Sequence, residues 1–405
     1  MIIGVLNVRY SPNLGDGLLA ECLEAELASI RPGIETRSID LAGRTAYGEG
    51  LKHRRAILAL LESAPGLVRR VGVGAALGYT VQRRLRPQWR EAFRGLDALV
   101  LGGGNLLADA DLNFPTKIDG ALAEAAAADI PLGVYGIGVS DNWSSRGQAL
   151  FERALAGSRL THVAVRDERS KAIWDRRLRP AGVRAAQLCP DPAVLAARHF
   201  PPVAQRPGPP RIGLGLTDPL ALRYHTAGQS VRDETLTAWL AELVRGMAAK
   251  GWQVVLFTNG SPEDRAYLQK VAPQLQAAGS GGVSTAPAFS TPADLAGFIS
   301  GLDLIMAHRM HACIAGYAYA KPQIGFAWDE KLQSFFSSVG RGDFVAEAGR
   351  VPVPEVLALA DRALGEGVDA QTHAASIAQA RAEISRLLDS FDIAQPGQVP
   401  MQAAL

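Results

Sequence analysis

Short apolar runs alternate with amphipathic stretches along almost the whole chain. Runs rich in aliphatic side chains predict strands at residues 2–8, 34–39, 98–101, 132–137, 162–165 and 186–189, then at 211–216, 253–257, near 283, 304–307 and 323–326. Apolar positions at helical spacing predict helices at residues 18–30, 234–250, 262–271, 291–300, 311–320, 354–364 and 374–391. This alternation is typical of parallel sheets that carry helices on both faces.

A proline-rich segment divides the pattern into two halves. Residues 200–210 contain five prolines and one glycine, which fit neither a helix nor a central strand. We therefore predict two doubly wound Rossmann-like α/β domains, one over residues 1–200 and one over 211–350. The helices in residues 351–405 would pack back on the first domain. Ligands of such folds lie at the carboxyl ends of the strands.

The charge of the chain is unevenly distributed. The 405 residues carry a net charge of +2, which argues against a dedicated nucleic-acid-binding protein. Residues 44–94 hold eleven Lys or Arg and three acids, whereas the other 354 residues hold 31 and 37. This basic insert is either a solvated surface or a patch that rests on the anionic inner face of a membrane.

The sequence carries no sign of export or of membrane insertion. No apolar run reaches the length of a membrane-spanning helix, and the first residues form a strand pattern rather than a leader. Three scattered cysteines match neither a disulfide framework nor a zinc site. We expect a cytoplasmic protein, with peripheral contact at the inner membrane face if the insert binds lipid.

Two glycine-containing turns follow predicted strands of the first half. Asn13-Leu14-Gly15-Asp16-Gly17 precedes a helix, where small residues let backbone amides approach an anion. Asp16 there either caps the helix or acts on a substrate hydroxyl. Gly102-Gly103-Gly104-Asn105 is either a close backbone contact for a ligand or a tight turn, and it matches neither a dinucleotide-binding nor a Walker pattern.

Charged residues follow the later strands. Val165-Arg166-Asp167 and Pro190-Asp191-Pro192 are either parts of a ligand site or a structural salt bridge. His308-Arg309-Met310-His311 begins a helix, so a guanidinium, an imidazole and free backbone amides converge and suit a multiply charged anion. Lys331 adds a further cation. The two histidines also permit a metal, but no third ligand lies at suitable spacing, and we expect none.

Taken in order, these motifs resemble the polysaccharide pyruvyl transferase family. The matching segments, within about residues 1–340, are Asn13-Leu14-Gly15-Asp16, Leu101-Gly102-Gly103-Gly104, Val165-Arg166-Asp167-Glu168-Arg169-Ser170, Pro190-Asp191-Pro192, Arg309-Met310-His311, Lys321-Pro322-Gln323-Ile324-Gly325 and Asp329-Glu330-Lys331. The family typically has Ser-Arg-x-His at the fourth motif. His308 replaces that serine, which either adds a ligand or changes the shape of the pocket.

The resemblance implies a GT-B-like fold and transfer of the pyruvyl group of phosphoenolpyruvate onto two hydroxyls of a sugar. His311 would be the general acid, and Asp16, Asp191 or Asp329 the base. The donor itself is a substrate, and no cofactor is implied. The predicted substrate-binding residues are Arg309, Lys331, Arg166, His308, Asn13, Gly103, Gly104, Asn105 and Trp328. The first domain would bind the acceptor and the second domain phosphoenolpyruvate.

Two other functions remain open from the sequence. The first is a glycosyltransferase of the same fold with a nucleotide-sugar donor, although the helix predicted at residues 311–320 lacks the acid that would bind a ribose. The second is a non-catalytic protein that binds a sugar or an anion. The expected partners are phosphoenolpyruvate and a saccharide acceptor, free or lipid-linked, in the biosynthesis of a cell-envelope polysaccharide.

Overall fold

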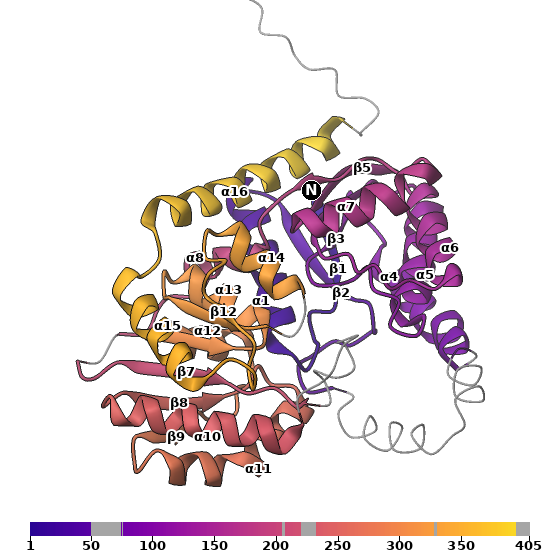
Figure 1. The fold of residues 1–405 in the computed structure, drawn as a ribbon. Coiled ribbons are helices and arrows are strands. Elements are labelled where there is room, and N and C mark those ends of the chain that lie inside the picture. The colour runs from indigo at the N-terminus through magenta and orange to yellow at the C-terminus, as the bar shows by residue number, and fades with distance from the viewer. Residues whose placement is uncertain (50–73, 75, 205–206, 220–231, 328–329, 394–405) are drawn as a thin grey trace, which may run out of the picture.

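Two parallel sheets of six strands each form the framework of the molecule (Figure 1). The computed structural model describes residues 1–49, 74, 76–204, 207–219, 232–327 and 330–393. The strand order is β2-β1-β3-β4-β5-β6 in the first sheet and β12-β11-β10-β7-β8-β9 in the second. We call the first sheet with its helices the N-terminal domain and the second the C-terminal domain. The fold is therefore a two-domain α/β arrangement, as expected.

The strands match the apolar runs of the sequence closely. Their bounds are β1 Ile2–Asn7, β2 Glu35–Asp40, β3 Ala98–Gly102, β4 Leu132–Ile137, β5 Leu160–Val165, β6 Gln187–Leu188, β7 Arg211–Gly215, β8 Gln253–Phe257, β9 Val283–Thr285, β10 Leu304–Ala307, β11 Gln323–Phe326 and β12 Val345–Ala346. The central strands β3, β4 and β10 are buried along their whole length, as expected where helices cover both faces. Strand β12 was not predicted, because its two residues belong to an apolar run of only three, Phe344-Val345-Ala346.

Helices connect the strands in both domains. In the N-terminal domain they are α1 Leu14–Ile30, α4 Arg86–Ala92, α5 Asn113–Ala127, α6 Ser145–Ala156, α7 Glu168–Arg177 and α8 Ala196–His199. Those of the C-terminal domain are α10 Asp233–Ala249, α11 Pro262–Ala278, α12 Pro292–Ser300, α13 Met310–Ala318, α14 Glu330–Ser338 and α15 Val353–Glu366, and the chain continues into α16 Ala370–Ile393. No helix in the described part of the chain is long and apolar enough to cross a membrane.

Helix α1 begins four residues earlier than the sequence pattern indicates. Asn13 is its N-cap and accepts a hydrogen bond from the Gly15 amide at 3.3 Å, so Asp16 lies in the first turn rather than at the cap. The low helix propensity of Gly15 concealed this turn in the sequence. Its missing side chain has a use, because a Cβ atom there would lie 2.5 Å from the Cβ of His311.

Helix α11 continues past the predicted end at residue 271. Pro273 lies inside this helix, where proline removes one backbone hydrogen bond. Pro273 is exposed to solvent, whereas Leu275 two residues later is fully buried. Packing of the apolar face therefore outweighs the local cost of the proline.

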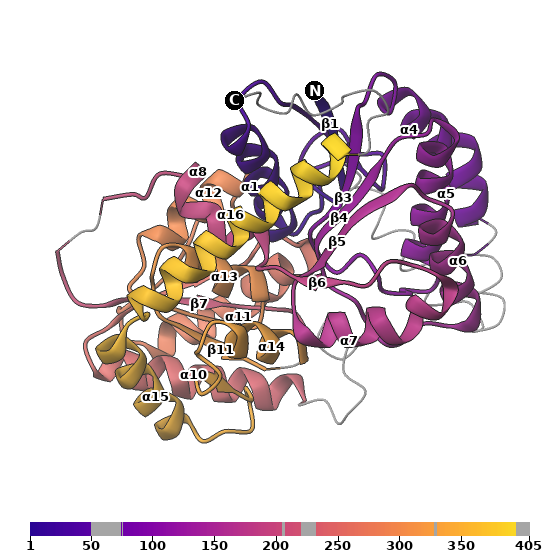
Figure 2. The same cartoon turned by 90° about the horizontal axis from the view of Figure 1, so that it is seen from above.

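Helix α16 carries the chain from the C-terminal domain back onto the N-terminal domain (Figure 2). It packs against α1, β4 and β5, where Leu387 and Phe391 fill the space left by the absent side chain of Gly133. Its buried residues share one continuous apolar cluster with α1, one face of the first sheet and the core of the C-terminal domain. The two domains are thus held together by a common core.

The basic insert lies mostly outside the described residues. Its last part is described and forms a helical segment that includes a π-helical turn, Val81–Leu85, and α4. Arg86 and Arg90 of this segment form ion pairs with Glu124 of α5, at 2.6 and 2.8 Å. These two arginines therefore have a structural partner within the domain.

Candidate functional site

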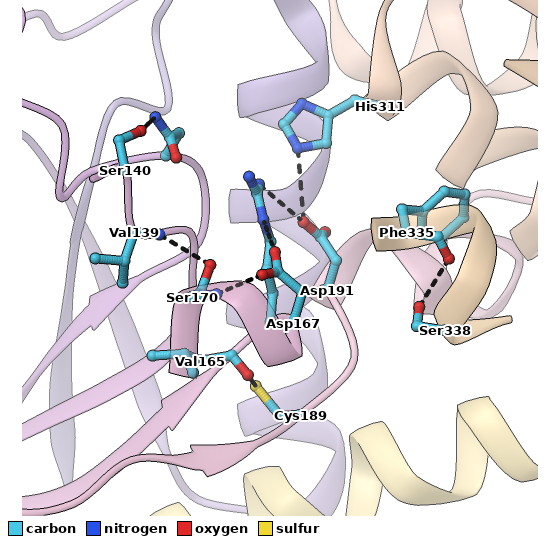
Figure 3. Close-up of polar contacts among 12 residues, drawn as sticks. Val139, Ser140, Val165, Asp167, Ser170, Cys189, Asp191, His311, Phe335 and Ser338 are labelled. Carbon is cyan, nitrogen blue, oxygen red and sulfur yellow. Dashed lines mark hydrogen bonds and ion pairs between the residues drawn. The ribbon is translucent and has the colours of Figure 1, made fainter. Parts of the chain in front are cut away.

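His311 lies between two carboxylates from the other domain. It is the second residue of α13 and is only 7% exposed. Its Nδ1 lies 3.6 Å from Oδ1 of Asp16 in the first turn of α1, and its Nε2 lies 3.6 Å from Oδ2 of Asp191 after β6. Figure 3 shows the imidazole facing the carboxylate of Asp191. The structure thus brings together three of the four predicted catalytic residues.

These contacts are close approaches rather than closed hydrogen bonds. A separation of 3.6 Å exceeds hydrogen-bond length, and neither His311 Nε2 nor Asp191 Oδ2 has a hydrogen-bond partner in the described part of the chain. Asp16 keeps a fifth of its side chain exposed, whereas Asp191 keeps 3%. The arrangement therefore leaves bonding capacity for a small ligand or a water molecule.

Asp191 is fixed by further contacts. One of its oxygens accepts a hydrogen bond from the Ala193 amide at 3.0 Å, and the other lies 3.9 Å from Nη1 of Arg166. Burial opposes its ionisation, but the neighbouring His311 ring and the Arg166 guanidinium outweigh that effect and lower the pKa of Asp191. Asp191 is thus a buried anion shared by an imidazole and a guanidinium.

Arg166 directly follows β5, and its side chain lies near residues that follow the neighbouring strands β4 and β6. Its Nε is 3.3 Å from the carboxylate of Asp167, and a Cβ atom on Gly138 would approach its Nη2 to 2.5 Å. The same Cβ atom would lie 2.8 Å from Oδ1 of Asn105, whose amide donates a hydrogen bond to Ser140 Oγ at 3.0 Å. The absence of a side chain at Gly138 therefore lets Arg166 and Asn105 approach each other.

The glycine-rich loop before Asn105 is a turn that other residues adopt poorly. Gly103 and Gly104 both have positive φ, at 74° and 75°, which favours glycine. The Gly104 carbonyl accepts a hydrogen bond from the Gly138 amide at 2.7 Å, so the loop is tied to the end of β4. Its role in the structure is to place Asn105 beside Arg166.

Arg309 lies in a tight ion pair within the C-terminal domain. Its Nε and Nη2 donate to the two oxygens of Asp264 at 2.9 and 3.0 Å, and the Asp218 amide also donates to Asp264. Burial raises the pKa of Asp264, although Arg309 opposes this change. The buried carboxylate of Asp264 therefore orients the guanidinium of Arg309 at the start of α13.

His308 is enclosed in the protein interior. It is 2% exposed, and its ring centroid lies 5.1 Å from that of Phe326. Burial and the neighbouring Arg309 lower the pKa of His308 to about 3, so its ring is neutral at physiological pH. A neutral, enclosed ring does not supply a positive charge to an anionic ligand.

A cavity of about 270 Å³ lies beside the His311 cluster. It is bounded by both domains and by α16, and its lining includes the two predicted cations Arg166 and Lys331. The other lining residues are Asp167, Glu168, Leu188, Cys189, Pro190, Asp191, Val194, Met310, Ile314, Phe335, Ser338, Val339, Ser376 and Gln379. The cavity thus combines a charged end with apolar walls, a composition common in small-molecule sites.

Other site residues lie elsewhere or were missed. Asn13 caps α1, and the predicted residues Trp328 and Asp329 lie outside the described part of the chain. Asp264, in the first turn of α11, and Gly138, directly after β4, were not among the predicted residues. Gln379 and Ser376 were not predicted, because they lie on α16, far along the chain from the other cavity residues, and no local motif marks them.

The two sheets, their shared core and a site between them define a two-domain α/β protein with a GT-B-like fold. Its fold is similar to that of a UDP-GlcNAc 2-epimerase from Methanocaldococcus jannaschii, with a TM-score of 0.57, 9% identity and coverage of 96% of this chain and 99% of that one. It is also similar to the UDP-GlcNAc 2-epimerase from Neisseria meningitidis bound to UDP-GlcNAc, with a TM-score of 0.55, 12% identity and coverage of 96% and 99%.

The sequence narrows this class to one family. Residues 13–330 match the model of the family described as polysaccharide pyruvyl transferase. The chain therefore belongs to the polysaccharide pyruvyl transferase family and is a transferase. No curated protein matches the sequence.

Proposed function

We propose that this protein transfers the pyruvyl group of phosphoenolpyruvate onto two hydroxyls of one sugar, releases phosphate and forms a cyclic pyruvate ketal. The observation that carries the proposal is His311 between Asp16 and Asp191, beside a cavity lined by Arg166 and Lys331. Phosphoenolpyruvate is a small, multiply charged anion, and cations in a partly dry cavity suit it. The family of the chain supports the same reaction.

His311 is the proposed general acid. A doubly protonated imidazole has one N–H facing each carboxylate, and Asp16 and Asp191 occupy those two directions. One proton moves from His311 to the methylene carbon of phosphoenolpyruvate, which becomes a methyl group and leaves a cation-like carbon at C2. Proton donation by a well-placed side chain typically contributes 10²–10⁴-fold to a rate.

Asp16 is the proposed base for the acceptor. It is the more exposed of the two carboxylates, and Asp191 is already held by the Ala193 amide and Arg166. The first sugar oxygen bonds to C2 as Asp16 takes its proton. The C2–O bond to phosphate then breaks with its electron pair on phosphate, and the second hydroxyl closes the ketal. Of the two hydroxyl protons, one replaces the proton that His311 gave and the other leaves with phosphate.

In this proposal, the cationic side chains of the site bind the phosphate group of phosphoenolpyruvate. Arg166 and Lys331 line the cavity from opposite domains, so the donor lies between the domains rather than in the C-terminal domain alone. Arg309, oriented by Asp264, adds a cation at the start of α13. These groups hold the donor and stabilise the negative charge that develops as phosphate leaves.

The test is phosphate release from phosphoenolpyruvate across a panel of hexosides, with mass analysis of the products for a pyruvate ketal. We expect release with at least one acceptor and a loss of about 10³-fold for His311→Gln, while Asp129→Asn, at an exposed position, retains activity. Phosphate release by His311→Gln at the wild-type rate would contradict the assigned role. UDP-GlcNAc in place of phosphoenolpyruvate tests for a nucleotide-sugar donor in the same assay.

A further inference from the structure

Helix α16 forms one wall of the cavity beside His311. The N-terminal domain contributes Arg166 and Asp191, the C-terminal domain contributes Lys331 and Phe335, and α16 contributes Ser376 and Gln379. The family match ends at residue 330, so it does not extend to this helix. Helix α16, which completes the cavity, therefore lies outside the part of the chain that the family match covers.

The position of α16 at the cavity is fixed by buried contacts. Tyr135 donates a hydrogen bond from its hydroxyl to the Ala380 carbonyl at 3.1 Å, one residue beyond Gln379. One turn further, Oε1 of the fully buried Glu383 lies 3.0 Å from Nε2 of His162. On the same helix, Arg381 pairs with the buried Glu26 of α1 at 2.7 Å. These contacts hold the backbone at Gln379 in one place on the cavity wall.

The two polar side chains of this wall differ in their bonding. Ser376 Oγ donates to the Thr372 carbonyl at 2.9 Å and lies 3.1 Å from the Tyr317 hydroxyl, so its capacity is largely used. The Gln379 side chain is exposed and makes no hydrogen bond within the described part of the chain. A neutral amide with free N–H groups thus faces the same space as two cations.

The charged groups of phosphoenolpyruvate match these two cations and this neutral amide. In phosphoenolpyruvate the phosphate carries more charge than the carboxylate, so Arg166 and Lys331 match the phosphate best. The carboxylate then needs a further donor, and the enol carbons need apolar walls such as Ile314 and Phe335. We propose that Gln379 donates a hydrogen bond from its amide to the carboxylate of phosphoenolpyruvate, so that α16 distinguishes this donor from inorganic phosphate. This inference rests on the proposed function.

The test compares Gln379→Ala and Gln379→Glu with Gln371→Ala, an exposed glutamine of the same helix outside the cavity lining. Loss of one hydrogen bond to a charged group raises the KM for phosphoenolpyruvate about tenfold, and an added carboxylate raises it about 100-fold. The KM for the acceptor and competitive inhibition by inorganic phosphate stay unchanged. Gln371→Ala has the wild-type KM.

Two outcomes would overturn this inference and leave the proposed function intact. A wild-type KM for phosphoenolpyruvate in Gln379→Ala removes the residue from the site, and a matching loss of inhibition by inorganic phosphate moves its contact to the phosphate. If the unsubstituted protein releases no phosphate with any acceptor, the proposed function fails instead. Gln379→Cys gives a readout that does not need turnover, because the three native cysteines are buried. Phosphoenolpyruvate should slow its labelling by a thiol reagent, and an unchanged labelling rate would also overturn the inference.

Discussion

Arg309 with Asp264 in the C-terminal domain and Arg166 with Asp191 in the N-terminal domain are two Arg–Asp pairs near His311, and they differ in how closely they are joined. In the C-terminal domain, Arg309 donates two hydrogen bonds to Asp264 at 2.9 and 3.0 Å. In the N-terminal domain, Arg166 lies 3.9 Å from Asp191, whose same oxygen faces His311 at 3.6 Å. The first pair is closed and serves to orient its arginine. The second is open, and a ligand can enter it without breaking a hydrogen bond.

The open pair should govern the chemical step. Asp191→Asn keeps the shape and the oxygen that accepts from Ala193, but it removes the charge beside His311. We expect kcat for phosphate release to fall about 100-fold, with a much smaller change in KM. Steady-state kinetics of the purified variant measures both. Asp129→Asn, at an exposed position, is the matched control, and equal kinetics for the two variants would contradict the comparison.

The closed pair should govern donor binding instead. Asp264→Asn removes the bidentate partner of Arg309 and leaves its guanidinium free to turn. We expect KM for phosphoenolpyruvate to rise about tenfold while kcat changes less. Glu263→Gln changes the neighbouring acid in the same helical turn and should have wild-type kinetics. A fall in kcat as large as that of Asp191→Asn would erase the difference between the pairs.

The position of Arg166 beside Asp191 can be disturbed by adding a side chain at Gly138. Gly138→Ala places a methyl group about 2.5 Å from its Nη2, so the guanidinium has to shift away. We expect KM for phosphoenolpyruvate to rise severalfold, with only a modest loss of thermal stability, because the end of an arginine side chain yields easily. Gly365→Ala in α15, where a Cβ meets nothing within 4 Å, should leave the kinetics unchanged. Equal kinetics for both variants would contradict the close packing.

The two aspartates should also respond oppositely to pH, which is the smallest expected effect. Burial raises the pKa of Asp264, whereas His311 and Arg166 outweigh burial and lower the pKa of Asp191. A raised carboxyl pKa adds stability below the unfolded pKa of about 3.9 and loses it as pH rises, and a lowered one does the reverse. From about pH 7 to about pH 3.5, the stability advantage of wild type should grow over Asp264→Asn and shrink over Asp191→Asn.

Urea unfolding of wild type and the two asparagine variants at both pH values measures these differences. Asp129→Asn again serves as the control, here for a change of one surface charge. A stability difference that changes in the same direction for both aspartates would show that the two pairs have similar electrostatics.

The sequence predicted the framework of the molecule better than its contacts. Every predicted strand is present, because a buried parallel strand reads as an apolar run of its own. Asp16, Asp191 and His311 were predicted as candidates because each lies just past a strand. The partner of Arg309 was not predicted, since Asp264 lies 45 residues away in the chain and no local pattern joins the two. The cavity wall of α16 depends on tertiary packing in the same way.

Helix α16 also changes how the two domains can move. The chain passes from the first domain to the second between α8 and β7 and returns through α16, so the two domains are connected twice rather than once. Two domains that are connected at two points rotate most easily about the line through those points, because rotation about any other line stretches one of the two connections. We therefore expect any opening of the cavity to be a rotation about that line, with the α16 wall on the side that moves least.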